Sequence, residues 1–396
     1  MVIDHLGKIK REGDNIKIAP TNRMRILHVF KTYYPDSFGG VEQVIRQLSA
    51  ATTQMGLVNR VFTLSRQADV TPLLHDGATT VVRAQTHFEA ASTPMSASAT
   101  KLFRKEADAA DIVHYHYPWP FGDLLHLMSG SRTPAVLTYH SDVVRQRMLM
   151  HVYRPLLRRF FADVKAVVPT SPNYVRSSPL LQQYADKTTV IPIGLDEESY
   201  PKPDARRLLH WEREVGRDFF LFVGVLRYYK GLHILLDACV DNASQVVIIG
   251  AGPVEVDLKR QAQQLGLTNV HFLGAVSDED KVALLKLCRA VVFPSHLRAE
   301  AFGVTLLEGA MYGKPLISSE IGTGSSYVNI DGVTGLVVPP NDPAALSAAM
   351  TRIGNDAQLA ADMGQRARAR FDELFTAERM GRSYVELYNQ VLKAKA

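Results

Sequence analysis

The chain has 396 residues, of which 46% are hydrophobic and 21% are charged, and its formal net charge is +5. This composition is typical of a soluble globular protein, and the length predicts two domains of about 150–200 residues each. No apolar run reaches the roughly 20 residues that a membrane-spanning helix requires, and the positive charge is too small and too dispersed to indicate a nucleic-acid-binding protein.

The first residues, 1–23, are polar and mixed in charge, without the apolar core of a signal peptide. We expect them to form a flexible extension before the first strand. The two cysteines, Cys239 and Cys288, fall among apolar neighbours in predicted helices. This placement indicates buried free thiols in a reducing cytoplasm rather than a disulfide.

Apolar strand-like runs alternate with amphipathic helical stretches along both halves of the chain. The alternation predicts an α/β fold with two doubly wound, Rossmann-like domains that face each other across a cleft. A turn-rich stretch at 196–204 predicts a hinge between a domain at 24–195 and a domain at 205–375, and the helical pattern over 376–396 is expected to cross back onto the first domain. The predicted strands are 25–30, 59–64, 111–116, 135–139, 166–169 and 188–193 in the first domain, and 219–223, 245–250, 270–273, 290–293, 315–318 and 336–338 in the second.

Two glycines, Gly39 and Gly40, follow the first predicted strand and precede a helix. Glycines at a helix entrance let the backbone approach a phosphate or a sugar closely. The same pair also forms ordinary turns, so this motif alone leaves both interpretations open.

Histidines mark the ends of two later strands of the first domain. His114 and His116 share one face of a strand, but no third ligand follows at a suitable spacing, which argues against a metal site. We expect His116, with Trp119, to shape a pocket for an acceptor. His140 ends the next strand and is predicted to point into the cleft toward a reacting sugar, the alternative being a structural histidine bonded to its own loop.

A basic amphipathic stretch covers residues 143–161. Such a stretch suits an anionic membrane surface, whereas the alternative is a helix that packs on the core and exposes solvated arginines. Pro155 interrupts its periodicity. The arginines are Arg145, Arg147, Arg154, Arg158 and Arg159.

In the second domain, Arg227 and Lys230 follow the strand at 219–223. An arginine fork and a lysine point charge at the carboxyl end of a strand suit a diphosphate, although a solvated basic loop has the same pattern.

Two further patterns favour structural roles. Gly250 and Gly252 follow a strand, but the third glycine of a dinucleotide fingerprint is missing, so a nicotinamide site is not predicted.

Asp278 and Asp280 form an Asp-x-Asp pattern that occurs in metal-dependent sugar transfer, yet they follow Ser277 at a predicted helix start. There, capping and the helix dipole account for them, and no metal is needed.

Two glutamates, Glu300 and Glu308, flank a glycine turn between a strand and a helix. Between them the backbone N–H groups of Phe302, Gly303 and Val304 open a helix N-terminus, which suits a phosphate. A carboxylate beside such a site makes sense when it binds sugar hydroxyls, so the motif indicates an anionic nucleotide that carries a sugar.

Taken together, these motifs resemble the retaining glycosyltransferases of family 4, which have the GT-B fold. The resemblance implies that Glu308 binds the nucleotide ribose and Glu300 the hydroxyls of the transferred sugar, while His140 orients or stabilises that sugar. It also implies that transfer retains the anomeric configuration and needs no metal. The remaining donor-binding residues would be Gly39, Gly40, Arg227, Lys230, Phe302, Gly303 and Val304.

Within the family, residues 28–43 are similar to bacterial mannosyl- and rhamnosyltransferases that build surface polysaccharides such as O-antigen. That similarity implies GDP-mannose as donor, a polyprenyl-diphosphate-linked saccharide as acceptor, and a peripheral enzyme on the cytoplasmic face of the inner membrane. Open alternatives are a rhamnosyl- or other hexosyltransferase that uses a GDP-, UDP- or dTDP-sugar, and a nucleotide-sugar 2-epimerase on the same fold. A nucleotide-binding protein without turnover is disfavoured because the catalytic motifs are intact.

Overall fold

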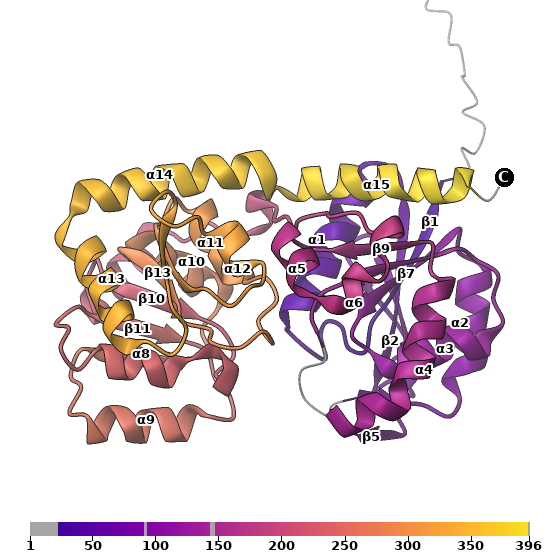
Figure 1. Cartoon of the computed structure of the whole chain (residues 1–396), viewed down its shortest axis with the longest axis horizontal. Helices are drawn as coiled ribbons and strands as arrows, with labels where there is room; N and C mark the ends of the chain where they lie inside the picture. Colours follow the sequence, from indigo (N-terminus) through magenta and orange to yellow (C-terminus); the bar gives the residue numbers. More distant parts are fainter. Residues whose placement is uncertain (1–22, 91–92, 143–146, 395–396) are drawn as a thin grey trace, which may run out of the picture.

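The computed structural model describes residues 23–90, 93–142 and 147–394. The predicted extension at 1–23 therefore lies almost wholly outside the described residues. Two α/β domains stand side by side, and two long helices run along one face of both (Figure 1).

The first domain is built on a seven-stranded sheet in the order β3-β4-β2-β1-β7-β8-β9, parallel except for the antiparallel pair β3–β4. Helices cover it, and a small hairpin, β5–β6, stands apart. Its strands are β1 (Arg25–Val29), β2 (Val58–Ser65), β3 (Leu73–Asp76), β4 (Thr79–Gln85), β5 (Phe88–Ala90), β6 (Thr93–Met95), β7 (Ile112–Tyr117), β8 (Ala135–Tyr139) and β9 (Ala166–Pro169). Its helices are α1 (Gly40–Gln54), α2 (Ala99–Asp108), α3 (Pro120–Ser129), α4 (Arg147–Asp163), α5 (Pro172–Ser177), α6 (Pro179–Gln182) and the 3₁₀ turn η1 (Ala185–Lys187).

Three differences from the predicted strands concern this domain, and one is the hairpin β5–β6, which the sequence analysis did not predict. The strands β3 and β4 add an edge that the sequence analysis did not predict, because β3 is short and alternates in exposure instead of forming a continuous apolar run. The prediction of a strand at 188–193 is wrong: the segment runs beside β9 with a single bridge from Val167 to Thr188. Pro192 has no N–H to extend a ladder there.

The second domain is a six-stranded parallel sheet in the order β12-β11-β10-β13-β14-β15. All six strands predicted for it are confirmed within one residue at each end, because strands covered on both faces read as continuous apolar runs. They are β10 (Phe220–Val223), β11 (Val246–Ile249), β12 (Val270–Gly274), β13 (Ala290–Phe293), β14 (Leu316–Ser319) and β15 (Gly335–Val338). The helices are α7 (Ala205–Val215), α8 (Leu232–Ala238), α9 (Glu255–Gln264), α10 (Asp278–Leu287), α11 (Val304–Met311), α12 (Ser325–Val328), α13 (Pro343–Asn355) and the 3₁₀ turn η3 (Tyr228–Lys230).

The chain passes between the domains twice, and the two passages lie side by side. The backbone N–H of Leu195 donates to Phe375 O (2.9 Å), and that of Ala377 donates to Leu195 O (3.0 Å). A Cβ on Gly194 would lie 2.1 Å from Thr376 O, so only glycine fits this crossing. The first passage continues through the 3₁₀ turn η2 (Glu197–Ser199).

The last two helices link the domains. Helix α14 (Ala357–Leu374) covers the second domain, and α15 (Ala377–Lys393) lies along the first (Figure 1). The Tyr388 hydroxyl reaches His114 Nδ1 in the first domain at 2.7 Å. One apolar cluster runs through both domains at this junction, including Leu48, Leu195, Leu307 and Phe375.

Candidate functional site

The entrance of α11 places Glu300 and Glu308 on either side of a helix N-terminus. Gly303 caps the helix with φ 88°, where a side chain is strained, and an added Cβ would come within 3.1 Å of Phe293 and Leu306. The helix then begins at Val304, so the N–H groups of its first turn point beyond its end. Glu300 is 9% exposed and Glu308 is 3% exposed, so both carboxylates are held inside the protein.

Glu300 forms an ion pair with Lys230, and both side chains are largely buried. Burial lowers the pKa of Lys230, but the adjacent carboxylate outweighs that effect, so the pKa is raised above its ordinary value. The ammonium group also lies 4.7 Å from the centroid of the Phe293 ring. Lys230 therefore already balances a buried negative charge, and its predicted contact with a diphosphate stays a prediction.

Arg227 is exposed and has no ion-pair partner within 23–90, 93–142 and 147–394. It lies at the carboxyl end of β10, at the start of the turn that ends in Lys230. Across the cleft, the pKa of Lys31 is lowered mainly by burial, and the positive charge of Arg227 lowers it further, whereas Glu42 acts in the opposite direction. Positive charge from both domains therefore collects beside the α11 entrance.

Glu308 is held by residues that the sequence analysis missed. Lys281 Nζ lies 3.0 Å from Glu308 Oε1, and the Tyr200 hydroxyl donates to the same oxygen at 3.0 Å. Gln43 of α1 donates its Nε2–H to the Tyr200 oxygen at 2.7 Å. No local periodicity or motif marks these contacts, because they join residues far apart in the chain.

The first domain faces this site directly. A Cβ built on Gly40 would lie 3.9 Å from Val304 Cγ2, so the glycine pair lies next to the start of α11. Asp142 pairs with Arg298 at 3.0 Å, and Arg298 belongs to the loop that carries Glu300. The structure thus brings the Gly39–Gly40 turn, the loop after β8 and the α11 entrance to one interdomain cleft.

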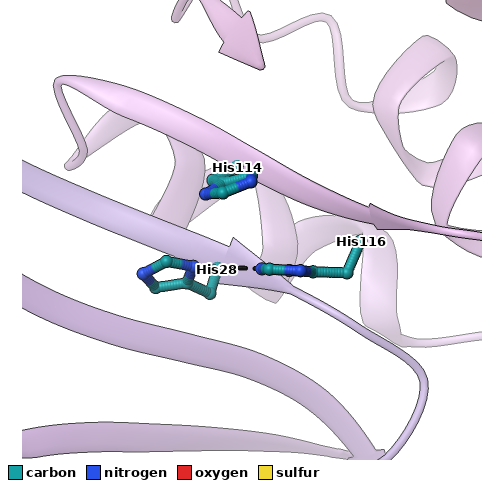
Figure 2. A group of neighbouring side chains, drawn as sticks. All are labelled: His28, His114 and His116. Atoms are coloured by element: carbon teal, nitrogen blue, oxygen red, sulfur yellow. Dashed lines mark hydrogen bonds between the residues drawn. The ribbon is translucent and has the colours of Figure 1, made fainter. Parts of the chain in front are cut away.

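His140 directly follows β8 at that cleft and is 5% exposed. Its Nε2 lies 2.9 Å from His116 Nδ1, and His116 Nε2 lies 3.1 Å from His28 Nδ1. Figure 2 shows the bond between His28 on β1 and His116 on β7, with His114 beside them. Burial lowers the pKa of His140 to about 3 and that of His28 to about 4, so both imidazoles are neutral near pH 7.

The ring nitrogens of His28, His114 and His116 lie within 4.8 Å of one another, close enough to suggest a metal site. Both nitrogens of His114 are already bonded, to Tyr388 at 2.7 Å and to Thr138 at 2.6 Å. Hydrogen bonds also join His28 to His116, so an ion would have to displace an existing network.

The two residues predicted to shape an acceptor pocket lie inside the first domain. His116 is 1% exposed and Trp119 is 2% exposed. Trp119 donates its Nε1–H to Pro94 O at 3.3 Å. Their acceptor role stays a prediction, and their burial limits it to supporting the residues that surround them.

The capping interpretation of Asp278 and Asp280 is confirmed. The Ser277 side chain accepts from the Asp280 N–H at the start of α10. Asp280 Oδ1 also accepts from Arg207 (2.6 Å) and Trp211 (2.8 Å), so this carboxylate is engaged within the second domain.

The other glycine pattern serves packing. A Cβ on Gly250 would lie 2.0 Å from Gly224 O, and one on Gly252 would lie 2.4 Å from Leu226 O. These glycines let the loops after β10 and β11 approach each other.

Part of the basic stretch forms the C-terminal half of α4. Arg154, Arg158 and Arg159 are exposed, whereas Phe160 and Phe161 are buried in the first domain. Arg145 lies outside the described residues. In this half of the helix Phe160 and Phe161 pack into the core, and the exposed charged side chains are the three arginines and Asp163. No helix in the described part of the chain is long and apolar enough to cross a membrane.

Comparison with known proteins gives two adjoining family matches. Residues 38–199 match the model described as Glycosyltransferase Family 4, and residues 210–370 match the one described as Glycosyl transferases group 1. The chain is 56% identical over 354 residues to the D-rhamnosyltransferase WbpZ of Pseudomonas aeruginosa, covering 89% of this chain and 93% of the relative. It is 51% identical over 373 residues to the O-antigen chain mannosyltransferase C of Escherichia coli, covering 94% of this chain and 100% of the relative.

Solved structures agree in fold. Sucrose-phosphate synthase from Thermosynechococcus elongatus superimposes with a TM-score of 0.77 at 22% identity, covering 94% of this chain and 100% of that chain. Anabaena HepE in complex with UDP and glucose gives a TM-score of 0.74 at 19% identity, covering 93% and 100%. These likenesses confirm the predicted GT-B architecture.

Proposed function

Since this chain belongs to the family 4 glycosyltransferases, we propose that it transfers mannose from GDP-mannose to a polyprenyl-diphosphate-linked saccharide during assembly of an O-antigen-type polysaccharide. The observation that carries the proposal is the pair of buried carboxylates, Glu300 and Glu308, on either side of the α11 N-terminus. The names of the two close relatives, a mannosyltransferase and a rhamnosyltransferase, support the sugar class.

Different groups of the site would bind different parts of the donor. The N–H groups of Phe302, Gly303 and Val304 would receive a phosphate, because a helix N-terminus carries partial positive charge. The exposed guanidinium of Arg227 is available to neutralise the diphosphate. The carboxylates on either side then accept hydrogen bonds from hydroxyls, Glu308 from the ribose and Glu300 from the transferred sugar.

This division makes the glutamates donor-binding groups rather than the two acids of a hydrolase. Glu300 is paired with Lys230 and Glu308 with Lys281, and a carboxylate that faces an ammonium group acts as a hydrogen-bond acceptor. Retention of configuration follows when the departing phosphate takes the acceptor proton on the face where the new bond forms.

Rhamnosyl transfer is the second candidate, because the relative at 56% identity is a D-rhamnosyltransferase. The donor decides between the two, so the experiment is a screen of GDP-mannose, GDP-rhamnose, UDP-sugars and dTDP-sugars with a polyprenyl-diphosphate-linked acceptor. We expect GDP release from GDP-mannose that depends on the acceptor. Release from GDP-rhamnose alone would favour the second candidate.

Two controls separate this proposal from other activities on the same fold. Glu300→Ala should abolish transfer, and full activity in that variant would overturn the site assignment. Formation of UDP from a UDP-sugar without any acceptor would instead indicate a nucleotide-sugar 2-epimerase.

We also propose that transfer needs no divalent metal. Asp280, the acid that most resembles part of a metal motif, is engaged by Ser277, Arg207 and Trp211. Activity should survive EDTA, and loss of activity that manganese restores would contradict the proposal.

A peripheral position on the cytoplasmic face of the inner membrane is proposed from the acceptor and from α4. The exposed Arg154, Arg158 and Arg159 offer positive charge to anionic headgroups. Since Phe160 and Phe161 face the core, the attraction through this half of α4 is electrostatic rather than apolar.

A further inference from the structure

Three imidazoles and one amide form a continuous hydrogen-bonded chain from the interior of the first domain to the cleft. Asn59 Oδ1 lies 3.2 Å from His28 Nε2, His28 Nδ1 lies 3.1 Å from His116 Nε2, and His116 Nδ1 lies 2.9 Å from His140 Nε2. All four residues are buried. His28 and His116 are the pair joined in Figure 2.

Asn59, at the inner end of this series of hydrogen bonds, determines which atom donates in each of them. The Asn59 amide nitrogen donates to the Ser49 carbonyl at 3.0 Å, and a carbonyl can only accept. The amide oxygen therefore faces His28, which must carry its proton on Nε2. A neutral imidazole has a single N–H, so His28 Nδ1 is an acceptor and receives the proton of His116 Nε2.

The direction of donation is then fixed outward, one ring at a time. Because His116 is protonated on Nε2, its Nδ1 accepts from His140 Nε2–H. His140 then has an unprotonated Nδ1 with a free lone pair. No donor in the described part of the chain reaches that nitrogen. Burial lowers the pKa of all three histidines, so each ring is neutral and carries a single N–H.

His140 lies on the loop that follows β8, near the second domain. Its backbone N–H donates to Tyr117 O at 3.1 Å, which holds it at the end of β8. Two residues later, Asp142 pairs with Arg298 of the loop that carries Glu300. The imidazole thus lies beside the cleft in which Glu300 would bind the sugar.

We propose that Asn59, His28 and His116 form a relay that holds His140 in the Nε2–H tautomer, so that its Nδ1 accepts a hydrogen bond from a hydroxyl of the donor sugar. The inner three are positioning residues, and only His140 touches the substrate. The inference rests on the proposed transfer from a nucleotide sugar. It deepens that function by requiring a hydroxyl, rather than an acceptor atom, at the sugar position that meets His140.

A matched pair of substitutions at His116 tests the relay. In His116→Asn the amide oxygen can occupy the place of Nδ1 and still accept from His140. In His116→Gln the amide reaches the place of Nε2, so it bonds His28 but leaves His140 without its acceptor. Both variants lose the same ring and its stacking on His114, 4.4 Å away between centroids, so that loss cancels in the comparison.

We expect kcat/KM for GDP-mannose to fall about 10-fold in His116→Gln relative to His116→Asn, the effect of one misdirected hydrogen bond. The imidazole ¹⁵N spectrum should show His140 protonated on Nε2 in the unsubstituted protein and in His116→Asn, and a tautomer mixture in His116→Gln. The His140 signals are assigned by their loss in His140→Gln.

Equal kinetics in the two variants, or a His140 ring protonated on Nδ1 in the unsubstituted protein, would overturn the relay. The second measurement needs no His116 variant and no substrate, so it decides the tautomer even where His116→Gln does not fold. If the unsubstituted protein transfers nothing from GDP-mannose or GDP-rhamnose, the proposed function fails first, and the two failures are thereby distinguished.

Discussion

Tyr200 donates its hydroxyl to Glu308 Oε1 across 3.0 Å while accepting a hydrogen bond from Gln43 at 2.7 Å. Gln43 belongs to α1 of the first domain, Tyr200 to the linker and Glu308 to α11 of the second domain. One phenol therefore connects the carboxylate proposed to bind the ribose with both domains.

Tyr200→Phe should weaken donor binding more than the chemical step. The substitution removes a hydrogen bond to a charged carboxylate, so we expect KM for the donor to rise about 10-fold with kcat changed less than about 2-fold. Steady-state kinetics with GDP-mannose measure both. Tyr312→Phe is the matched control, because the Tyr312 ring lies 6.5 Å from that of Tyr200 and its hydroxyl has no hydrogen-bond partner among the described residues. An unchanged donor KM in Tyr200→Phe would contradict this role.

The effects of substituting Lys230 and Glu300 on the free energy of unfolding should be strongly coupled. Removing one partner leaves the other charge buried, so each of Lys230→Met and Glu300→Gln should lower the free energy of unfolding by about 3 kcal/mol. The double variant should lie closer to the unsubstituted protein than either single variant does. Urea unfolding of the four proteins gives the coupling energy. The exposed pair Lys202–Glu198 is the control, with an expected coupling below about 1 kcal/mol; additive effects at Lys230 and Glu300 would show that the buried pair is not coupled.

Arg298 should help to keep the domains together. Its pair with Asp142 spans the cleft at 3.0 Å, and both side chains are partly exposed, so salt should weaken it. Arg298→Ala is expected to increase the radius of gyration measured by small-angle X-ray scattering at low salt. Arg289→Ala, which removes a pair with Asp218 inside the second domain, should leave the radius unchanged. Equal radii for the two variants would argue that this pair does not hold the cleft.

Stability should fall as the pH drops from about 6.5 toward 4. Burial lowers the pKa of His28 to about 4 and of His140 to about 3, and those of His114 and His116 fall well below the ordinary value of 6.5. In this window the unfolded chain binds more protons than the folded one, so the free energy of unfolding decreases by at most about 1.4 kcal/mol per pH unit for each histidine. Above pH 6.5 this contribution is fully present.

Urea unfolding at pH 7.5, 6 and 5 measures the slope. His28→Gln removes one of the titrating rings while keeping a donor for Asn59, and the slope should become shallower. A free energy of unfolding that stays level between pH 7.5 and 5 would contradict the neutral histidine chain.

The arginines of α4 should contribute to membrane attachment. Changing Arg154, Arg158 and Arg159 to serine removes three exposed positive charges, so sedimentation with vesicles rich in anionic lipid should decrease, most clearly at low salt. The control changes three exposed arginines of the second domain, Arg206, Arg213 and Arg352, to serine. An equal decrease in both proteins would reflect net charge alone.

Much of this architecture can be read from the sequence because its signals are local. The parallel strands of the second domain are continuous apolar runs, and the α11 entrance is marked by Gly303 between Glu300 and Glu308. The short edge strand β3 escaped prediction, since its exposure alternates along an edge. The segment at 188–193 has the apolar pattern of a strand but bonds to β9 only through the N–H groups of Thr189 and Ile191, because Pro192 has no N–H to donate.

The sequence by itself determined the two-domain α/β fold, the chemical character of the donor site and the order of its motifs, because periodicity and turn chemistry act over a few residues. Only the tertiary structure decided which charged and polar side chains pair with one another. It paired Lys230 with Glu300, seventy positions away, joined Glu308 to Tyr200 and Lys281, and aligned His28, His116 and His140 into one directed chain. Such contacts depend on how strands and domains pack, and a charge or a ring nitrogen acquires its role from the partner that packing brings to it.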